Sequence, residues 1–323
     1  MNPRPLAGVA LVSLAYGCAS TGSPTSRLSD TAGGYVPGAG GVKLHYVLDG
    51  TAGDTVVVLH GGPGLNLETV RPDLAPLARR HHLLYFDQRG SGRSEMPDSL
   101  QLTADAMVED LEALRRTFRL EPMTLLGHSW GGRLALLYAM RYPSRVRRMV
   151  LVGSLPLRGL PWGDEYFATQ RARRGDAEEA RRAALDSVIP SAADPYPACR
   201  EQMRLFLRGV AATPEIAQRI RGDGCAGTPE NLRAHAMVNR LVFQSISTDS
   251  GGSWDWRGRT AAIAMPALVV HGADDPLPLS SAEKLAAALP GSRLVVIPGA
   301  GHYPHAEQPE AFFPPVERFL DGE

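Results

Sequence analysis

The sequence predicts an α/β fold, in which helices cover a mostly parallel, doubly wound sheet. Short unbroken apolar runs, such as TVVVL at residues 55–59, suit strands that are buried on both faces of such a sheet. Segments with helical periodicity alternate with these runs, as expected for parallel strands joined by crossover helices. Charged helical patterns replace the alternation over residues 155–259. We therefore expect one core, residues 42–154 and 260–323, with a helical insertion at 155–259.

Seven strands and four helical patterns are expected in the core. The strands are Val42–Leu48, Thr55–Leu59, His82–Phe86, Met123–Gly127, Val146–Val152, Ala267–His271 and Arg293–Ile297. The helical patterns cover residues 103–118, 131–142, 281–289 and 310–320. Thr103 precedes acidic residues, which favours a helix start. Pro314 and Pro315 interrupt the last pattern.

The composition fits a chain with a sizeable core and gives no sign of a nucleic acid or an anionic surface as partner. The chain has 323 residues, of which 44% are hydrophobic, so it can bury a sizeable core. Its 34 basic and 34 acidic residues give a net charge of +0, and nothing in this balance points to nucleic acid.

The N-terminus has the pattern of an export signal. Arg4 precedes a short apolar run at residues 6–17, and Cys18 follows Gly17. We expect residues 1–18 to be a signal peptide, with Cys18 lipidated as in a bacterial lipoprotein; the alternative is an ordinary signal cut near Ala19. The protein would then be exported, either periplasmic or tethered to a membrane. Residues 19–41 are rich in small and polar residues and are expected to form a flexible linker.

Two further cysteines lie in the insertion, Cys199 and Cys225. In an exported protein they are suited to a disulfide, whereas two buried thiols are the equally weighted alternative. The sequence leaves both readings open.

The stretch TLLGHSWGGRLAL, residues 124–136, predicts a nucleophile. An apolar strand runs into Gly127-His128-Ser129-Trp130-Gly131 and then into a helix, which fits the G-x-S-x-G elbow. The turn raises the serine hydroxyl above the sheet, and glycines leave room for the backbone around it. A Gly-rich structural turn is the competing interpretation.

The partners of Ser129 are expected later in the chain, the acid before the histidine. Asp274 and Asp275 follow one strand, and His302 follows the next. We choose Asp275 as the acid, because Asp274 is suited to capping the turn, and His302 as the base rather than His305. His81, His82 and His235 lack comparable placement and are expected to be structural or exposed.

A third strand end carries HGGPG, residues 60–64. Its uncrowded amides favour an oxyanion hole, built from the N–H groups of Gly62 and Trp130. The stretch YFDQRGSGRS, residues 85–94, is expected to form a supporting turn ordered by Asp87 and Arg89.

Together these motifs resemble the α/β-hydrolase superfamily, and within it the proline iminopeptidase branch of serine peptidases. HGGPG, DQRGSGRS and GHSWGG carry the narrower resemblance, and the match spans residues 42–320 apart from the insertion. The resemblance implies Ser129 as nucleophile, Asp275 as acid and His302 as base, with Gly62 and Trp130 as oxyanion donors. It also implies a helical cap formed by residues 155–259, and no metal or organic cofactor.

One departure concerns the cap. In proline iminopeptidases cap glutamates bind the substrate's α-amino group, and the matching place here holds Arg233. The other acids expected in the cap are Glu165, Glu201, Glu215 and Glu230. Apart from this departure, the resemblance to proline iminopeptidases implies a hydrolase that releases N-terminal proline, or another small residue, from peptides.

Two alternatives stay open. One is an esterase, amidase or lactonase that acts on a small acyl substrate, and the other is a binding protein without catalysis. The expected partner is a small-molecule or short-peptide substrate, and the sequence does not address the oligomeric state.

Overall fold

A computed structural model describes residues 31–157, 162–249, 256 and 258–323. The expected signal peptide and Cys18 lie outside these residues. No helix in the described ranges is long and apolar enough to cross a membrane.

The centre of the molecule is an eight-stranded sheet in the order β1-β2-β4-β3-β5-β6-β7-β8. The strands are β1 Thr31–Pro37, β2 Lys43–Asp49, β3 Thr55–Leu59, β4 His82–Phe86, β5 Met123–His128, β6 Val146–Val152, β7 Ala267–Gly272 and β8 Arg293–Ile297. β2 pairs antiparallel with β1 and β4, whereas the pairs from β4 through β8 are parallel. The predicted α/β fold with a mostly parallel sheet is confirmed.

The first strand corrects an expectation. Residues 31–37 were expected to belong to a flexible linker, but they form β1, in register with β2 so that Tyr35 faces His45. Backbone hydrogen bonds hold this edge strand; of its described side chains Val36 is buried in the core, and Ala32 is partly buried against it. A segment that needs so little apolar burial carries no compositional sign of a strand.

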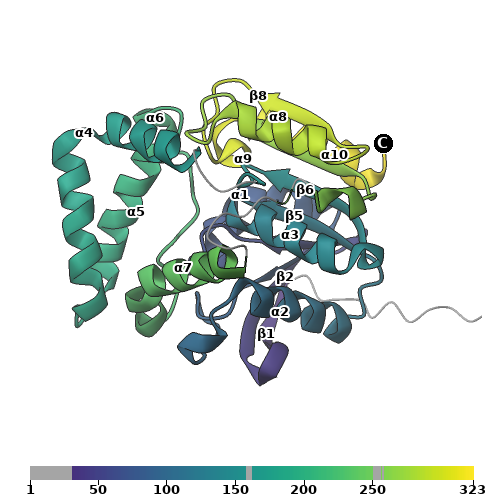
Figure 1. The fold of residues 1–323 in the computed structure, drawn as a ribbon, viewed down its shortest axis with the longest axis horizontal. Coiled ribbons are helices and arrows are strands. Elements are labelled where there is room, and N and C mark those ends of the chain that lie inside the picture. The colour runs from purple at the N-terminus through teal and green to yellow at the C-terminus, as the bar shows by residue number, and fades with distance from the viewer. Residues whose placement is uncertain (1–30, 158–161, 250–255, 257) are drawn as a thin grey trace, which may run out of the picture.

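Helices cover both faces of the sheet (Figure 1). The α-helices of the described residues are α1 Arg71–Leu74, α2 Ala104–Thr117, α3 Trp130–Arg141, α4 Trp162–Val188, α5 Tyr196–Val210, α6 Pro214–Ala217, α7 Pro229–Asp249, α8 Leu279–Ala288, α9 Pro304–Glu307 and α10 Pro309–Asp321. α10 continues through Pro314 and Pro315, where the sequence suggested an interruption. Its buried stripe of Phe312, Val316 and Phe319 packs on the sheet and offsets the hydrogen bonds that two prolines cannot donate.

The core lies on both sides of the sheet, which explains the unbroken apolar runs. Along β3, Val57 and Leu59 face the cluster that contains α2 and α3, whereas Val56 and Val58 face the cluster that contains α10. Alternate residues thus enter different cores, and the four positions after Thr55 are all apolar.

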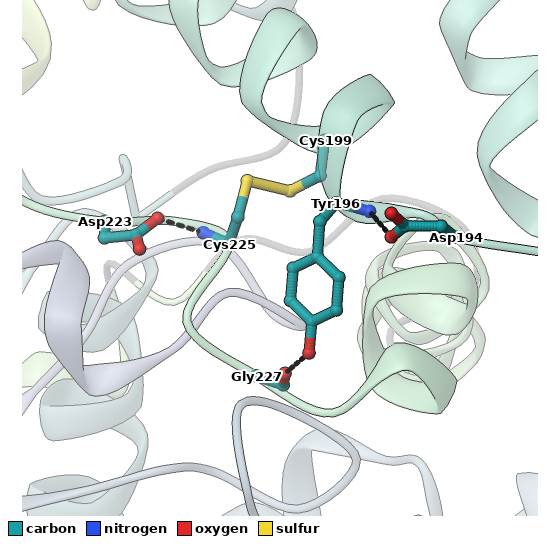
Figure 2. The surroundings of a disulfide bond; sticks show 6 residues. All are labelled: Asp194, Tyr196, Cys199, Asp223, Cys225 and Gly227. Carbon is teal, nitrogen blue, oxygen red and sulfur yellow. Dashed lines mark hydrogen bonds between the residues drawn. A yellow bond between two sulfur atoms is a disulfide. The ribbon is translucent and has the colours of Figure 1, made fainter.

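The segment between β6 and β7 contains α4 to α7 (Figure 1), and α4, α5 and α6 extend away from the sheet. Cys199 at the start of α5 and Cys225 before α7 form a disulfide, which selects one of the two alternatives that the sequence left open. Figure 2 shows that the Tyr196 hydroxyl donates to the Gly227 carbonyl across the same junction, at 2.7 Å. The disulfide and this hydrogen bond join α5 to the segment that leads into α7.

Candidate active site

Ser129 occupies a strained turn between β5 and α3. Its φ of 54° and ψ of −116° are unusual for a residue with a side chain, and its amide donates to the Val152 carbonyl at 2.8 Å. A Cβ on Gly131 would lie 2.1 Å from the Leu59 carbonyl oxygen, and one on Gly127 would lie 2.4 Å from that of Gly131. Glycines are therefore required on both sides of the serine.

Asp275 and His302 meet at the carboxyl ends of β7 and β8. The His302 Nδ1 and the Asp275 Oδ2 lie 2.9 Å apart, and the Leu277 amide donates to the other carboxylate oxygen at 2.9 Å. Both side chains are buried. Asp274 is exposed, and its hydrogen bonds are made by its backbone: the carbonyl accepts from Arg173 and the amide donates to the Ala300 carbonyl.

Ser129 and His302 line the same cavity, which has a volume of about 890 Å³. The hydrogen bonds of the described residues do not include one from the Ser129 hydroxyl to the His302 ring. Such a contact is often long before substrate binds and shortens in the reacting complex.

Gly62 and Trp130 line the cavity beside Ser129. Gly62 has a φ of +44°, which favours glycine, and its carbonyl accepts the Leu65 amide in a tight turn. Trp130 is the first residue of α3, so its amide has no acceptor within the helix. In the described part of the chain neither amide has a hydrogen-bond acceptor. Both are thus available to an anionic oxygen.

Gln88, which the sequence analysis did not select, joins the two oxyanion elements. Its amide N–H donates to His60 Nε2 at 3.1 Å, and its side-chain oxygen accepts the Trp130 indole N–H at 2.8 Å. Burial lowers the pKa of His60, so its ring is neutral and its Nδ1 donates to the Gly61 carbonyl. The neighbouring Asp87 orders the supporting turn, since it accepts amides from Leu67 and Arg93.

Glu307, also not selected from the sequence, holds the backbone around His302. Its carboxylate accepts the amides of Gly301 at 2.7 Å, Tyr303 at 2.9 Å and Ala212 at 2.9 Å. It is fully buried, and burial raises its pKa. The His302 amide itself donates to Val210, the last residue of α5. Glu307 is the fifth residue after the histidine in GHYPHAEQP, but its burial could not be read from the sequence.

His128 and His305 lie behind the base without entering the pair with Asp275. His128 Nε2 hydrogen-bonds the His302 carbonyl at 2.9 Å, and burial holds its pKa well below the usual range. His305, the rival candidate for the base, is completely buried, and burial lowers its pKa to about 3. It is not part of the cavity wall described here.

The cap supplies the rest of the cavity wall. From α7, His235 packs on Gly64, and Asn239 donates to the Pro63 carbonyl at 3.4 Å. From α4, the Tyr166 ring stands 6.3 Å from the His302 ring. The cap's charged residues on the wall are Asp164, Arg171, Arg174, Glu179, Arg182 and Asp186.

Arg233 and the acids named from the sequence lie elsewhere. Arg233 donates to the carbonyls of Ala192 and Ala193, at 2.7 and 2.6 Å. Of the described residues that line the cavity, none is Arg233, Glu165, Glu201, Glu215 or Glu230. Among the described residues, no group of three His, Cys, Asp or Glu side chains is arranged to hold a metal ion.

Comparison with known proteins agrees with this architecture. A model of the alpha/beta hydrolase fold family matches residues 54–309, so the chain belongs to that family and is a hydrolase of the α/β fold. The resemblance to the superfamily is thereby confirmed. A proline iminopeptidase of Heyndrickxia coagulans is 26% identical over 294 residues, which cover 90% of this chain and 98% of that protein. A putative 2-succinyl-6-hydroxy-2,4-cyclohexadiene-1-carboxylate synthase of Bacillus subtilis is 30% identical over 272 residues, covering 83% and 91%.

Solved structures show the same fold. A thermophilic esterase from Thermogutta terrifontis aligns with a TM-score of 0.65 at 24% identity, covering 90% of this chain and 98% of the esterase. Est816, described as an N-acyl homoserine lactone degrading enzyme, aligns with a TM-score of 0.60 at 25% identity, covering 88% and 100%.

Proposed function

We propose that the protein is a serine hydrolase with Ser129 as nucleophile, His302 as general base and Asp275 as the acid that orients His302. One observation carries the proposal: His302, whose Nδ1 lies 2.9 Å from Asp275, lines the same cavity as the strained Ser129 turn and two unengaged amides. These are the parts that acyl transfer requires.

The reaction follows from this arrangement. His302 takes the Ser129 proton as the serine oxygen attacks the substrate carbonyl, and the amides of Gly62 and Trp130 stabilise the oxyanion. The tetrahedral intermediate expels the leaving group, which takes the proton from His302. Water, deprotonated by His302, then hydrolyses the acyl-enzyme and restores the serine. Asp275 stabilises the imidazolium in both steps.

The preferred substrate class is a short peptide from which an N-terminal proline, or another small residue, is released. The proline iminopeptidase relatives support this choice.

The test uses proline 2-naphthylamide and a fluorophosphonate probe. The folded protein is expected to release naphthylamine and to be labelled on Ser129, and Ser129→Ala should abolish labelling and lower kcat/KM by at least ~10³-fold. A folded wild type that resists the probe would favour a binding protein without catalysis. Labelling without peptidase turnover would reject the aminopeptidase.

An esterase, amidase or lactonase is the second candidate. The wall near Ser129 is largely neutral, with Leu65, Leu155, Phe243 and Asn239, and this surface would suit an uncharged acyl group. The candidate is favoured if short-chain esters or lactones are cleaved while the aminoacyl naphthylamide is not.

We also propose export, with Cys18 as a lipid anchor. The Cys199–Cys225 disulfide supports an oxidising compartment. Fractionation of cells that express the full chain, followed by mass spectrometry of the mature N-terminus, tests both parts of this proposal. A cytosolic protein that keeps Met1 contradicts them.

A further inference from the structure

The cavity continues beyond Ser129 into the cap. Its outer wall includes Gln170 and Arg174 from α4 and Gln202 and Phe206 from α5. The volume of about 890 Å³ is in the range of pockets that hold drug-sized molecules, so both halves of a cleaved substrate have room.

One side of the cavity lies beside the Gly62 loop, and the other side lies beside the His302 ring. On one side α7 contacts the loop that carries Gly62, through His235 and Asn239. On the other side α4 brings Tyr166 beside the His302 ring. Because His302 gives its proton to the leaving group, the leaving group lies on the α4 side.

Gln170 lies on this side, one turn after Tyr166 along α4. Its side chain is only 4% exposed. Its Oε1 accepts a hydrogen bond from the Arg174 NH1 at 3.2 Å, which orients the amide. Its Nε2 has no hydrogen-bond acceptor in the described part of the chain. The amide does approach the Tyr166 side chain: burial raises the pKa of that phenol, and the contact with Gln170 opposes the rise. A buried donor of this kind is costly unless a ligand oxygen or water accepts from it.

Arg171 adds a positive charge at the same part of the wall. Arg174 and Arg182 are both paired with Glu179, at 2.7 and 3.3 Å. Arg171 is exposed, lines the cavity and has no carboxylate partner among the described residues.

We propose that Gln170 and Arg171 form a leaving-group subsite that binds a carbonyl or carboxylate oxygen of the departing half of the substrate. The Gln170 amide donates to the first carbonyl after the scissile bond, and Arg171 attracts the terminal carboxylate of a short peptide. This inference rests on the proposed serine hydrolase, because the catalytic roles of His302 and Gly62 decide which side of the cavity holds the leaving group.

The experiment compares two leaving groups on the same acyl group. Prolyl-glycyl-glycine carries both acceptors, whereas the naphthylamine of proline 2-naphthylamide carries neither. In Gln170→Leu, kcat/KM for the tripeptide is expected to fall about tenfold, which is the effect of one lost hydrogen bond, while that for the naphthylamide stays within about twofold. Arg171→Gln should reduce the preference of the enzyme for the tripeptide over its C-terminal amide. For an esterase, acetoxyacetate and phenyl acetate replace the two substrates.

Two further variants keep the result interpretable. Gln202→Leu is the matched control, because Gln202 lines the same cavity but its amide already donates to Asp186; it should change both substrates equally or not at all. Gln170→Glu keeps the size of the side chain without the donor, and should reproduce the selective loss. If the wild type cleaves both substrates and the Gln170 variants change them equally or leave them unchanged, the subsite is wrong and the hydrolase stands. No turnover of either pair by a folded wild type overturns the proposed function and the subsite with it.

Discussion

At the scale of single residues, the site depends on backbone geometry as much as on the reacting groups. The His302 amide donates to the Val210 carbonyl, and the His302 carbonyl is hydrogen-bonded by His128. The amides of the residues before and after His302 both donate to the Glu307 carboxylate. These contacts place the ring so that its Nδ1 meets Asp275. A fixed base is valuable, because small displacements of a reacting group cost large factors in rate.

Glu307→Gln should therefore act on the chemical step. An amide cannot accept from donors on both of its ends, so at least one of the three backbone bonds is lost. We expect kcat to fall about tenfold with KM within about twofold, measured well below the melting temperature. Glu310→Gln, at an exposed position on α10, is the control and should leave both constants unchanged. A lower melting temperature with an unchanged kcat would assign Glu307 a purely structural role.

At the scale of elements, the core strands could be predicted closely, and the reason is physical. Thr55–Leu59, His82–Phe86, Val146–Val152 and Arg293–Ile297 have the bounds expected from the sequence. Central strands must be apolar at most positions, since both of their faces are covered. β1 was not predicted, because this edge strand depends on backbone pairing with β2 rather than on apolar side chains.

The residues of the candidate site also fall into two groups, those that the sequence predicts and those that it does not. Ser129 and the Gly62 turn could be predicted because short local patterns create them, and Asp275 and His302 because each follows a predicted strand. Gln88, Glu307 and Gln170 could not. Their roles depend on which polar groups tertiary packing buries and leaves with or without a partner, and no local pattern records that.

The disulfide is the next feature to test at this scale. The disulfide joins Cys199 on α5 to Cys225 (Figure 2). The last residue of α5, Val210, accepts the His302 amide, and the segment that contains Cys225 is anchored to the core by the contact of Arg221 with Asp73. Replacing both cysteines by alanine should lower the free energy of unfolding by roughly 3 kcal/mol, as for a bridge that closes a loop of this size. Urea unfolding measures the loss, and kcat should fall with it because α5 positions the base.

A reducing agent provides the internal control for that experiment. It should destabilise the wild type by a similar amount and have no effect on the double variant. Equal stability of the wild type and the double variant would show that the rest of the cap holds α5 without the bridge.

At the scale of the whole molecule, buried neutral histidines should govern its stability in mild acid. Burial lowers the pKa of five histidines in the described part of the chain, namely His60, His81, His128, His235 and His305. In the unfolded chain their pKa is about 6.5. Below that pH the unfolded state therefore binds more protons at these histidines than the folded state does. The stability that these groups contribute is present above pH ~6.5 and is lost as the pH falls, by up to about 1.4 kcal/mol per pH unit for each histidine.

Two buried carboxyl groups oppose this trend. Burial raises the pKa of Glu307 and of Asp110, so the folded state takes up protons there first and gains stability as the pH falls through their raised pKa values. Because five histidines with a lowered pKa outnumber these two carboxyl groups, the free energy of unfolding should still decrease as the pH falls from 7 to 5.5.

His305→Leu tests this account, because His305 has no hydrogen-bond partner among the described residues and packs against Phe312 and Tyr303. An apolar side chain of similar size should leave stability at pH 7.5 nearly unchanged, since the ring is neutral there and makes no polar contact that would be lost. The slope of unfolding free energy against pH, measured by urea titration between pH 7 and pH 5.5, should decrease by about a fifth, because one of the five histidines with a lowered pKa is gone. A slope equal to that of the wild type would mean that His305 takes up a proton in the folded state. The low pKa of about 3 that burial gives this ring would then be wrong.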